Sequence, residues 1–551
     1  MKSLKFTIGV LILSGINFLS AQKAELKNQT NIKHIIVIGC DGMSPDGIQK
    51  AETPFMDFMI ENGAYTFTAR SVLPTSSSSN WASMIMGAGT EQHGITSNDW
   101  ERDDFVLPPV VKGDENIFPT IFNVIKTNIP QSEIGAVYHW DGFGRLFEKS
   151  KVDFDRRGST ESETVEIASE YIISKKPLFT FVHLDHVDGA GHKYGHGSQE
   201  YYNSVAIADK LIGKIFEASK TAGTFESTLF IVTSDHGGIG YGHGGETIDE
   251  IEIPFILFGN GIKNGYKILQ PVYTYDNAAT VAFALNIQQP YAWIGRAVKS
   301  AFEGYSEPKI DYLPVNIKPP VIYPARNFYE PAGGLFVDVG PVVRIETNER
   351  DVQIRFTIDG TEPDINSSLY EKEFTLKNSA VVQAKVFNNQ KEQSIVASAF
   401  FRVAKSNSVN GIMYKYFEGT NWKFLPAFES INHIKEGKTQ EFRIGKLNIK
   451  DENFGFVFES YIKIENEGEY KFYTNSDDGS KLFINDVEIV DNDGDHGTIE
   501  RSGKIHLTKG FHKINVRYFN GGGGAWLDVY FRGPGIPKQI IPPDVLFLSK
   551  Q

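Results

Sequence analysis

Short apolar runs alternate with amphipathic segments between residues 32 and 305. Residues 34–39, 178–182 and 229–233 form nearly continuous runs rich in β-branched and aromatic side chains. Such runs are typical of strands that are buried on both faces of a mostly parallel sheet. Residues 204–221 repeat apolar side chains at helical spacing, and residues 164–174 form a second helix-like segment. The pattern predicts an α/β domain over residues 32–305, with helices on both faces of the sheet.

The pattern changes in the C-terminal half of the chain. Prolines recur between Pro308 and Pro331, which indicates an extended connector, and we place a linker at residues 306–317. Beyond it, apolar and polar residues alternate with period 2, which is typical of half-buried strands. We therefore predict two all-β modules, the second of which starts near Gly411.

Alternating segments define the strands of these modules. Ile354–Ile358 runs into Asp359-Gly360, a dipeptide typical of tight β-hairpins. Further strands are expected at residues 470–474, 481–484 and 513–518.

The N-terminus has the pattern of a secretory signal peptide. Lys2 and Lys5 precede an apolar run from Phe6 to Leu19, and Ser20-Ala21-Gln22 supplies small residues before a polar one. The apolar run is shorter than a helix needs to cross the hydrocarbon core of a membrane. We predict a signal peptide over residues 1–21, no transmembrane segment, and a secreted, periplasmic or cell-surface protein.

Composition narrows the chemistry. The chain has 551 residues, with 55 Lys+Arg against 68 Asp+Glu and a formal net charge of −13. An acidic chain is a poor binder of nucleic-acid polymers, since such binding needs cations to neutralise phosphates. One Cys excludes intramolecular disulfides and multi-cysteine metal sites. A metal site in this chain must therefore use oxygen and imidazole ligands.

Carboxylates and imidazoles follow the apolar runs of the α/β domain. They are Asp41, Asp188, His192, Asp235, His236 and His243. Side chains beyond the carboxyl ends of parallel strands point into the crevice where ligands bind. Three Asp and three His suit borderline divalent ions such as zinc, and they exceed what one tetrahedral ion needs. Two adjacent ions account for the number better.

A run of hydroxyls supplies candidate nucleophiles. Residues 76–79 are all Ser, and Asn98 lies downstream. A metal-bound hydroxyl is deprotonated near neutral pH and can attack phosphorus or sulfur. An Asn amide can donate a hydrogen bond to the oxygen on which charge accumulates.

These clusters resemble the alkaline phosphatase superfamily, and within it the type I phosphodiesterase/nucleotide pyrophosphatase family. The resemblance rests on the segments 39–42, 74–77, 188–192 and 234–237. It implies Ser77 as the nucleophile and Asn98 as a phosphate contact. Ser stands where the family has Thr, and Ser79 stands where it has Pro, so Ser76 and Ser78 remain alternative nucleophiles.

The same resemblance implies a ligand set for two zinc ions. Asp188, His192 and His243 would hold one ion. The other would be held by Asp41, Asp235, His236 and Ser77. The short spacing from His236 to His243 is more similar to the ethanolamine-phosphate transferases of glycolipid anchor synthesis, which share this core.

The C-terminal blocks resemble two further families. Residues 356–363 are similar to the small β-sandwich appended to chitobiases and hexosaminidases, and this resemblance covers residues 318–404. Residues 476–480 are similar to a PA14 domain with a β-barrel-like fold, and this resemblance covers residues 408–551. In lectin-like PA14 domains paired Asp residues bind calcium and a sugar, and Asp477 and Asp478 occupy that place. A pair that only caps a loop is the competing interpretation.

The sequence thus predicts a secreted two-zinc phosphoric ester hydrolase that favours diesters and forms a phosphoserine intermediate. Its substrate is a phosphate ester, with glycans and glycolipids among the candidates. A phosphomonoesterase is the first alternative. A glycan-binding surface protein with a degenerate enzyme domain is the second.

Overall fold

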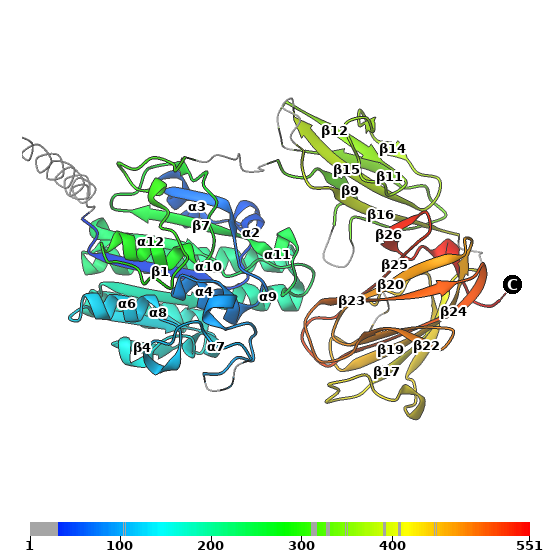
Figure 1. The fold of residues 1–551 in the computed structure, drawn as a ribbon, viewed down its shortest axis with the longest axis horizontal. Coiled ribbons are helices and arrows are strands. Elements are labelled where there is room, and N and C mark those ends of the chain that lie inside the picture. Colours follow the sequence, from blue (N-terminus) through cyan, green and yellow to red (C-terminus); the bar gives the residue numbers. More distant parts are fainter. Residues whose placement is uncertain are drawn as a thin grey trace, which may run out of the picture.

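The computed structural model describes residues 31–550 apart from 103, 105, 310–316, 327–330, 348, 350, 389–392, 406–408, 446 and 448. The predicted signal peptide and most of the predicted linker lie outside the described residues. The described chain forms an N-terminal α/β domain followed by two β modules (Figure 1). The predicted fold class is confirmed.

An eight-stranded sheet forms the centre of the N-terminal domain. Its strands, in spatial order, are β4 (Phe154–Arg157), β3 (Ile134–Tyr138), β5 (Phe179–Leu184), β1 (His34–Cys40), β6 (Thr228–Thr233), β7 (Glu252–Gly259), β2 (Ala64–Arg70) and β8 (Tyr266–Lys267). The first five run parallel to one another, and β7 is antiparallel to both β6 and β2. The carboxyl ends of β1, β5 and β6 therefore meet at one edge of the sheet.

Helices cover both faces because the central strand is apolar on both sides. Ile35 and Val37 of β1 join one core, whereas Ile36 and Ile38 join the other. The first core is covered by α4 (Ser77–Met86), α6 (Ile121–Asn128), α7 (Asp141–Gly144) and α12 (Asp276–Ala284). The second is covered by α2 (Pro45–Lys50), α3 (Pro54–Glu61), α8 (Glu161–Lys175) and α10 (Gln199–Ala222). Both predicted helical segments lie inside α8 and α10.

The first β module packs two sheets around a small core. One contains β10 (Gly333–Val337), β16 (Ala397–Ala404), β15 (Ala380–Asn388), β12 (Val352–Thr357) and β13 (Ser368–Leu369), and the other β14 (Phe374–Thr375), β11 (Val342–Glu346) and β9 (Val321–Tyr323). Val382 and Phe401 are among the residues of the core between the sheets.

The hairpin predicted at Asp359-Gly360 is confirmed by the antiparallel pairing of β12 and β13, but its turn is longer than a dipeptide. β12 pairs with β13, and the connection runs over residues 358–367. The carboxylate of Asp359 accepts hydrogen bonds from the backbone N–H and the hydroxyl of Thr361, at 3.0 and 2.6 Å. This side-chain turn satisfies the backbone locally, so the chain continues past the glycine before it reverses.

The second β module is a larger pair of sheets. One contains β18 (Lys435–Thr439), β17 (Ile412–Glu418), β19 (Phe454–Ile464), β24 (Gly510–Asn520), β21 (Ser480–Ile484) and β22 (Val487–Asn492), with β27 (Leu546–Phe547) beside β19. The other contains β23 (Ile499–Leu507), β20 (Gly468–Asp477), β25 (Trp526–Gly533) and β26 (Ile536–Ile540). The strands predicted at 470–474, 481–484 and 513–518 are confirmed.

The two β modules are joined by a buried ion pair. Arg402 of β16 and Glu441 of the second module contact each other, and both are almost fully buried. Among the described residues, no helix is both long and apolar enough to cross a membrane.

Cys40 at the end of β1 is fully buried. Burial, followed by the charges of Asp209, Asp41 and Asp235, raises the pKa of its thiol to about 12. We expect a thiol reagent at mildly alkaline pH to label native protein at least about a hundredfold more slowly than denatured protein, because the thiolate is the reactive form. Rapid labelling of folded protein would contradict this environment for Cys40.

Candidate active site

The six predicted Asp and His ligands gather at the carboxyl edge of the sheet. Asp41 directly follows β1, and Asp235 follows β6. α9 (His186–Tyr194) begins just beyond β5 and presents Asp188 and His192 one turn apart. Because these three strands are neighbours, their ends bring the side chains together.

One group, which we call the 188 group, consists of Asp188, His192 and His243. The Asp188 carboxylate lies 3.2 Å from His192 Nε2 and 3.8 Å from His243 Nε2. The charge of Asp188 is the main cause that raises the pKa of His192 to about 10. Burial lowers the pKa of His243 to about 4. The Asp188 carboxylate therefore faces two different imidazoles. His192 favours the protonated form, and His243 favours the neutral form.

The second group, the 41 group, consists of Asp41, Asp235 and His236. His236 Nε2 lies 3.3 Å from Asp41 Oδ1 and 3.2 Å from Asp235 Oδ2. Burial and the neighbouring Asp41 raise the pKa of Asp235 well above its usual range. Two adjacent buried carboxylates repel each other, and a dication between them relieves that repulsion. The rings of His236 and His243 stack with centroids 3.7 Å apart, so the two groups adjoin.

Main-chain carbonyls fix all three imidazoles. The Nδ1–H of His192 donates to the carbonyl of Tyr241 at 2.8 Å. His236 donates to Gly237 at 2.7 Å, and His243 donates to Thr75 at 2.7 Å. Donation from Nδ1 leaves the lone pair on Nε2, which is how zinc-bound histidines are usually held.

The carboxylates present atoms that a metal would satisfy. Asp41 Oδ1, Asp188 Oδ1 and Asp235 Oδ2 are buried and have no hydrogen-bond partner in the described part of the chain. Each of these atoms lies within 4 Å of an imidazole Nε2. Buried charged oxygens without a partner are costly unless a cation coordinates them. The residues therefore fit two divalent ions.

The serine run begins at the N-terminus of α4. Ser77 Oγ lies 3.3 Å from His236 Nε2, next to the 41 group. Ser76 Oγ instead bonds Ser79 Oγ at 2.8 Å, and Ser78 is fully buried. The side-chain oxygen of Asn98 accepts a hydrogen bond from the Ser78 backbone N–H at 2.8 Å. The side-chain NH2 group of Asn98 is the part of the amide that can donate a hydrogen bond.

Trp81 of α4 connects the first core to the 41 group. Its indole N–H donates to Asp41 Oδ2 at 2.9 Å, and its ring is fully buried. Gly39 of β1 faces that ring: a Cβ there would lie 2.4 Å from Trp81 carbon atoms. The absence of a side chain at Gly39 therefore lets the indole reach the ligand.

Three functional-site residues escaped the sequence prediction. His183 Nε2 lies 3.4 Å from Asp41 Oδ2, and Asp185 joins them in a third group of ligating atoms. Burial, with Asp41 and Asp188, raises the pKa of Asp185 to about 8. His196 Nε2 lies 3.9 Å from Asp188. His183 and Asp185 stand at the end of β5, so the rule used for the other ligands could have found them.

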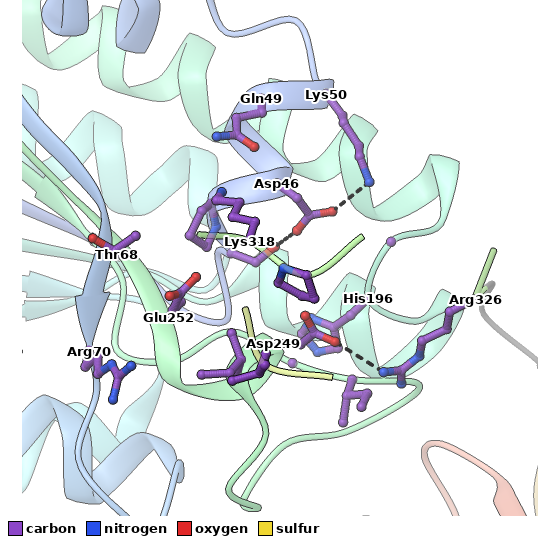
Figure 2. Close-up of a pocket in the computed structure, with 18 of the residues that line it drawn as sticks. Asp46, Gln49, Lys50, Thr68, Arg70, His196, Asp249, Glu252, Lys318 and Arg326 are labelled. Carbon is purple, nitrogen blue, oxygen red and sulfur yellow. Dashed lines mark hydrogen bonds and ion pairs between the residues drawn. The ribbon is translucent and has the colours of Figure 1, made fainter. Parts of the chain in front are cut away.

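A separate cavity of about 640 Å³ is lined in part by His196, the residue that also approaches Asp188 of the 188 group. Figure 2 shows its mixed charges, with ion pairs between Lys50 and Asp46 and between Arg326 and Asp249. Because these opposite charges neutralise each other, the cavity lacks the concentrated negative charge that defines the metal groups.

The paired Asp residues of the C-terminal module are both buried. Each Asp478 oxygen accepts a backbone N–H, from His496 at 2.9 Å and from Gly521 at 2.9 Å. These contacts cap a loop, as the competing interpretation expects. Calcium and glycan binding at Asp477 and Asp478 remain predictions.

Comparisons with known families agree with this division of the chain. Residues 35–241 match the family model for type I phosphodiesterase / nucleotide pyrophosphatase. The predicted resemblance is confirmed. Residues 331–398 match the chitobiase/β-hexosaminidase C-terminal domain, and residues 408–544 match the PA14 domain. The catalytic family match ends two residues before His243.

Curated relatives match the N-terminal part. GPI ethanolamine phosphate transferase 1 of Yarrowia lipolytica is 24% identical over 274 residues, which cover 45% of this chain and 29% of that protein. Human bis(5'-adenosyl)-triphosphatase ENPP4 is 25% identical over 214 residues, 37% of this chain and 47% of that protein. The chain thus spans less than half the length of these relatives. A solved structure of human ectonucleotide pyrophosphatase/phosphodiesterase 5 is 15% identical, with a TM-score of 0.42, over 49% of this chain and 100% of that one.

Trp81→Phe tests the support of Asp41. Loss of the indole N–H leaves Asp41 less firmly oriented, so we expect zinc affinity to fall by about 10- to 100-fold. Trp293→Phe is the matched control, since its buried indole N–H donates to Pro119 at 3.0 Å instead of to a ligand. Competition with a zinc chelator measures both variants. Equal losses in the two would contradict a specific role for Trp81.

Proposed function

We propose that the chain is a secreted two-zinc hydrolase of phosphoric esters that favours phosphodiesters. The observation that carries the proposal is the set of imidazoles anchored through Nδ1, with Nε2 facing buried carboxylates. The family match over residues 35–241 supports the same class of reaction. Secretion rests on the pattern of residues 1–21, which lie outside the described structure.

The residues divide into two ligand sets. Asp188, His192 and His243 would hold one zinc ion. Asp41, Asp235 and His236 would hold the other, with Ser77 adjacent. When bound, such ions activate oxygen nucleophiles and stabilise charge that develops on leaving oxygens.

In this proposal Ser77 attacks phosphorus. Ser77 begins a helix of 10 residues, so the positive end of the helix dipole would stabilise the developing phosphate charge. The Ser77 backbone N–H and the Asn98 amide would bind a non-bridging oxygen. Attack forms a Ser–O–P bond as the alcohol leaves, and water then displaces the serine oxygen to regenerate the hydroxyl.

Charge around the site supports a diester over a monoester. A monoester carries an extra negative charge, which phosphatases commonly neutralise with Arg or Lys. Here Arg145 contacts Glu101 and the carbonyl of Asn98. Arg157 lies 3.6 Å from Asp141 and donates to a main-chain carbonyl. Both guanidinium groups are thus engaged by other partners.

Metal removal tests the class of enzyme. We expect EDTA to abolish hydrolysis of bis-p-nitrophenyl phosphate and zinc to restore it, because every predicted ligand is an oxygen or an imidazole. Faster turnover of p-nitrophenyl phosphate would instead favour a monoesterase. Glycan binding without any EDTA-sensitive turnover would favour the binding-protein alternative.

The nucleophile is tested separately. Ser77→Ala removes the attacking oxygen, so we expect kcat to fall at least about a thousandfold while both zinc ions are retained. Ser76→Ala and Ser78→Ala serve as matched controls within the same run. Full activity of Ser77→Ala, or a comparable loss in either control, would move the nucleophile to another serine.

A further inference from the structure

The C-terminal β module packs directly on the loop that carries His243. The rings of Tyr241 and Trp526 lie 6.3 Å apart. A Cβ on Gly242 would lie 3.1 Å from Thr498 Oγ1 and 3.6 Å from Asp477 Oδ2. Figure 1 shows α9 and α11 (Ile248–Ile251) on the side of the catalytic domain that faces β23. The second module therefore borders the 188 group.

The loop in question holds two ligands at once. It contains His243, and its Tyr241 carbonyl receives the Nδ1–H of His192. The His192 side chain is 37% exposed, so the region beside it is open to solvent. The exposed side of His192 therefore adjoins the loop on which the C-terminal module packs.

Asp477 is the charged side chain that this module presents there. It ends β20 and is only 4% exposed, with Oδ2 against Gly242 of the loop and Gly524 of its own module. Gly242, whose backbone this oxygen faces, directly precedes the candidate ligand His243. Among the residues that the structure describes, its carboxylate has no hydrogen-bond donor, whereas Asp478 has two.

We infer that Asp477 determines specificity in the ester hydrolase proposed above, by contacting the alcohol portion of a phosphodiester bound at the 188 group. A carboxylate accepts hydrogen bonds and attracts cations, so it favours alcohols that carry hydroxyl or ammonium groups. The inference rests on the proposed function and narrows its substrate class.

The burial of Asp477 makes this contact effective. Burial and the neighbouring Asp478 raise the pKa of Asp477 well above its usual range, so ionisation of this carboxylate is costly without a partner. A bound donor or cation offsets that cost, and it does so more than at an exposed carboxylate because water competes less.

Asp477→Asn tests the inference with three substrates: glycerophosphoethanolamine, glycerophosphoglycerol and bis-p-nitrophenyl phosphate. We expect the ratio of kcat/KM for glycerophosphoethanolamine to that for bis-p-nitrophenyl phosphate to fall about tenfold or more. Comparison of ratios cancels the intrinsic reactivity of each ester, and the ethanolamine and glycerol arms separate a cation from neutral hydroxyls.

Two variants and a calcium arm complete the design. Asp486→Asn makes the same charge change at a side chain that is 74% exposed and paired with Lys513, and it should leave every ratio unchanged. Asp477→Glu keeps the charge and should retain the preference. A preference that appears only with added calcium would overturn the direct contact and assign it to a bound ion.

The outcomes separate the two proposals. Turnover by the wild-type protein with ratios unchanged in Asp477→Asn would overturn only the role of Asp477. No turnover of any ester by the wild-type protein would overturn the proposed function itself. If Asp477→Asn does not fold, N-acetylation of the ethanolamine substrate supplies the test in wild-type protein: loss of the charge should lower kcat/KM, and an unchanged value would overturn the inference.

Discussion

The candidate site depends on hydrogen bonds that imidazoles make to the main chain. Carbonyls of Thr75, Gly237 and Tyr241 take the Nδ1–H of three histidines. A carbonyl can only accept, so each ring is held in one tautomer and one orientation. The serine segment, the end of β6 and the loop under the C-terminal module must all keep their places for this to hold. The metal site is therefore coupled to the geometry of three separate chain segments.

Much of this arrangement follows from the sequence because strand ends are easy to locate. Apolar runs place β1, β5 and β6, and each Asp or His that follows one is a candidate ligand. Ser77 needed the family resemblance to be chosen from its neighbours, since a serine run alone does not say which hydroxyl faces His236. The partners of the imidazoles are main-chain carbonyls, which every residue has, so the amino-acid sequence cannot indicate which of them accept these hydrogen bonds.

Other features depend on tertiary contacts that local patterns do not encode. The Asp359-Gly360 dipeptide predicted a hairpin with a short turn. The turn is longer, because the Asp359 carboxylate accepts the Thr361 N–H and the chain reverses only further on. The approach of Asp477 to the catalytic domain joins positions that are distant along the chain. Period and composition describe each module separately, so the contact between modules could emerge only from the folded chain.

The proximity of Trp81 to Gly39 has a consequence for how the chain can vary. Gly39 has no side chain that could bind a metal, and a glycine inside a central strand usually weakens the strand. Yet the indole occupies the space that any side chain at position 39 would need. A larger residue at position 39 would displace Trp81 from Asp41 and remove the hydrogen bond that orients this member of the 41 group. Position 39 must therefore be glycine for Trp81 to keep its hydrogen bond to the candidate ligand Asp41.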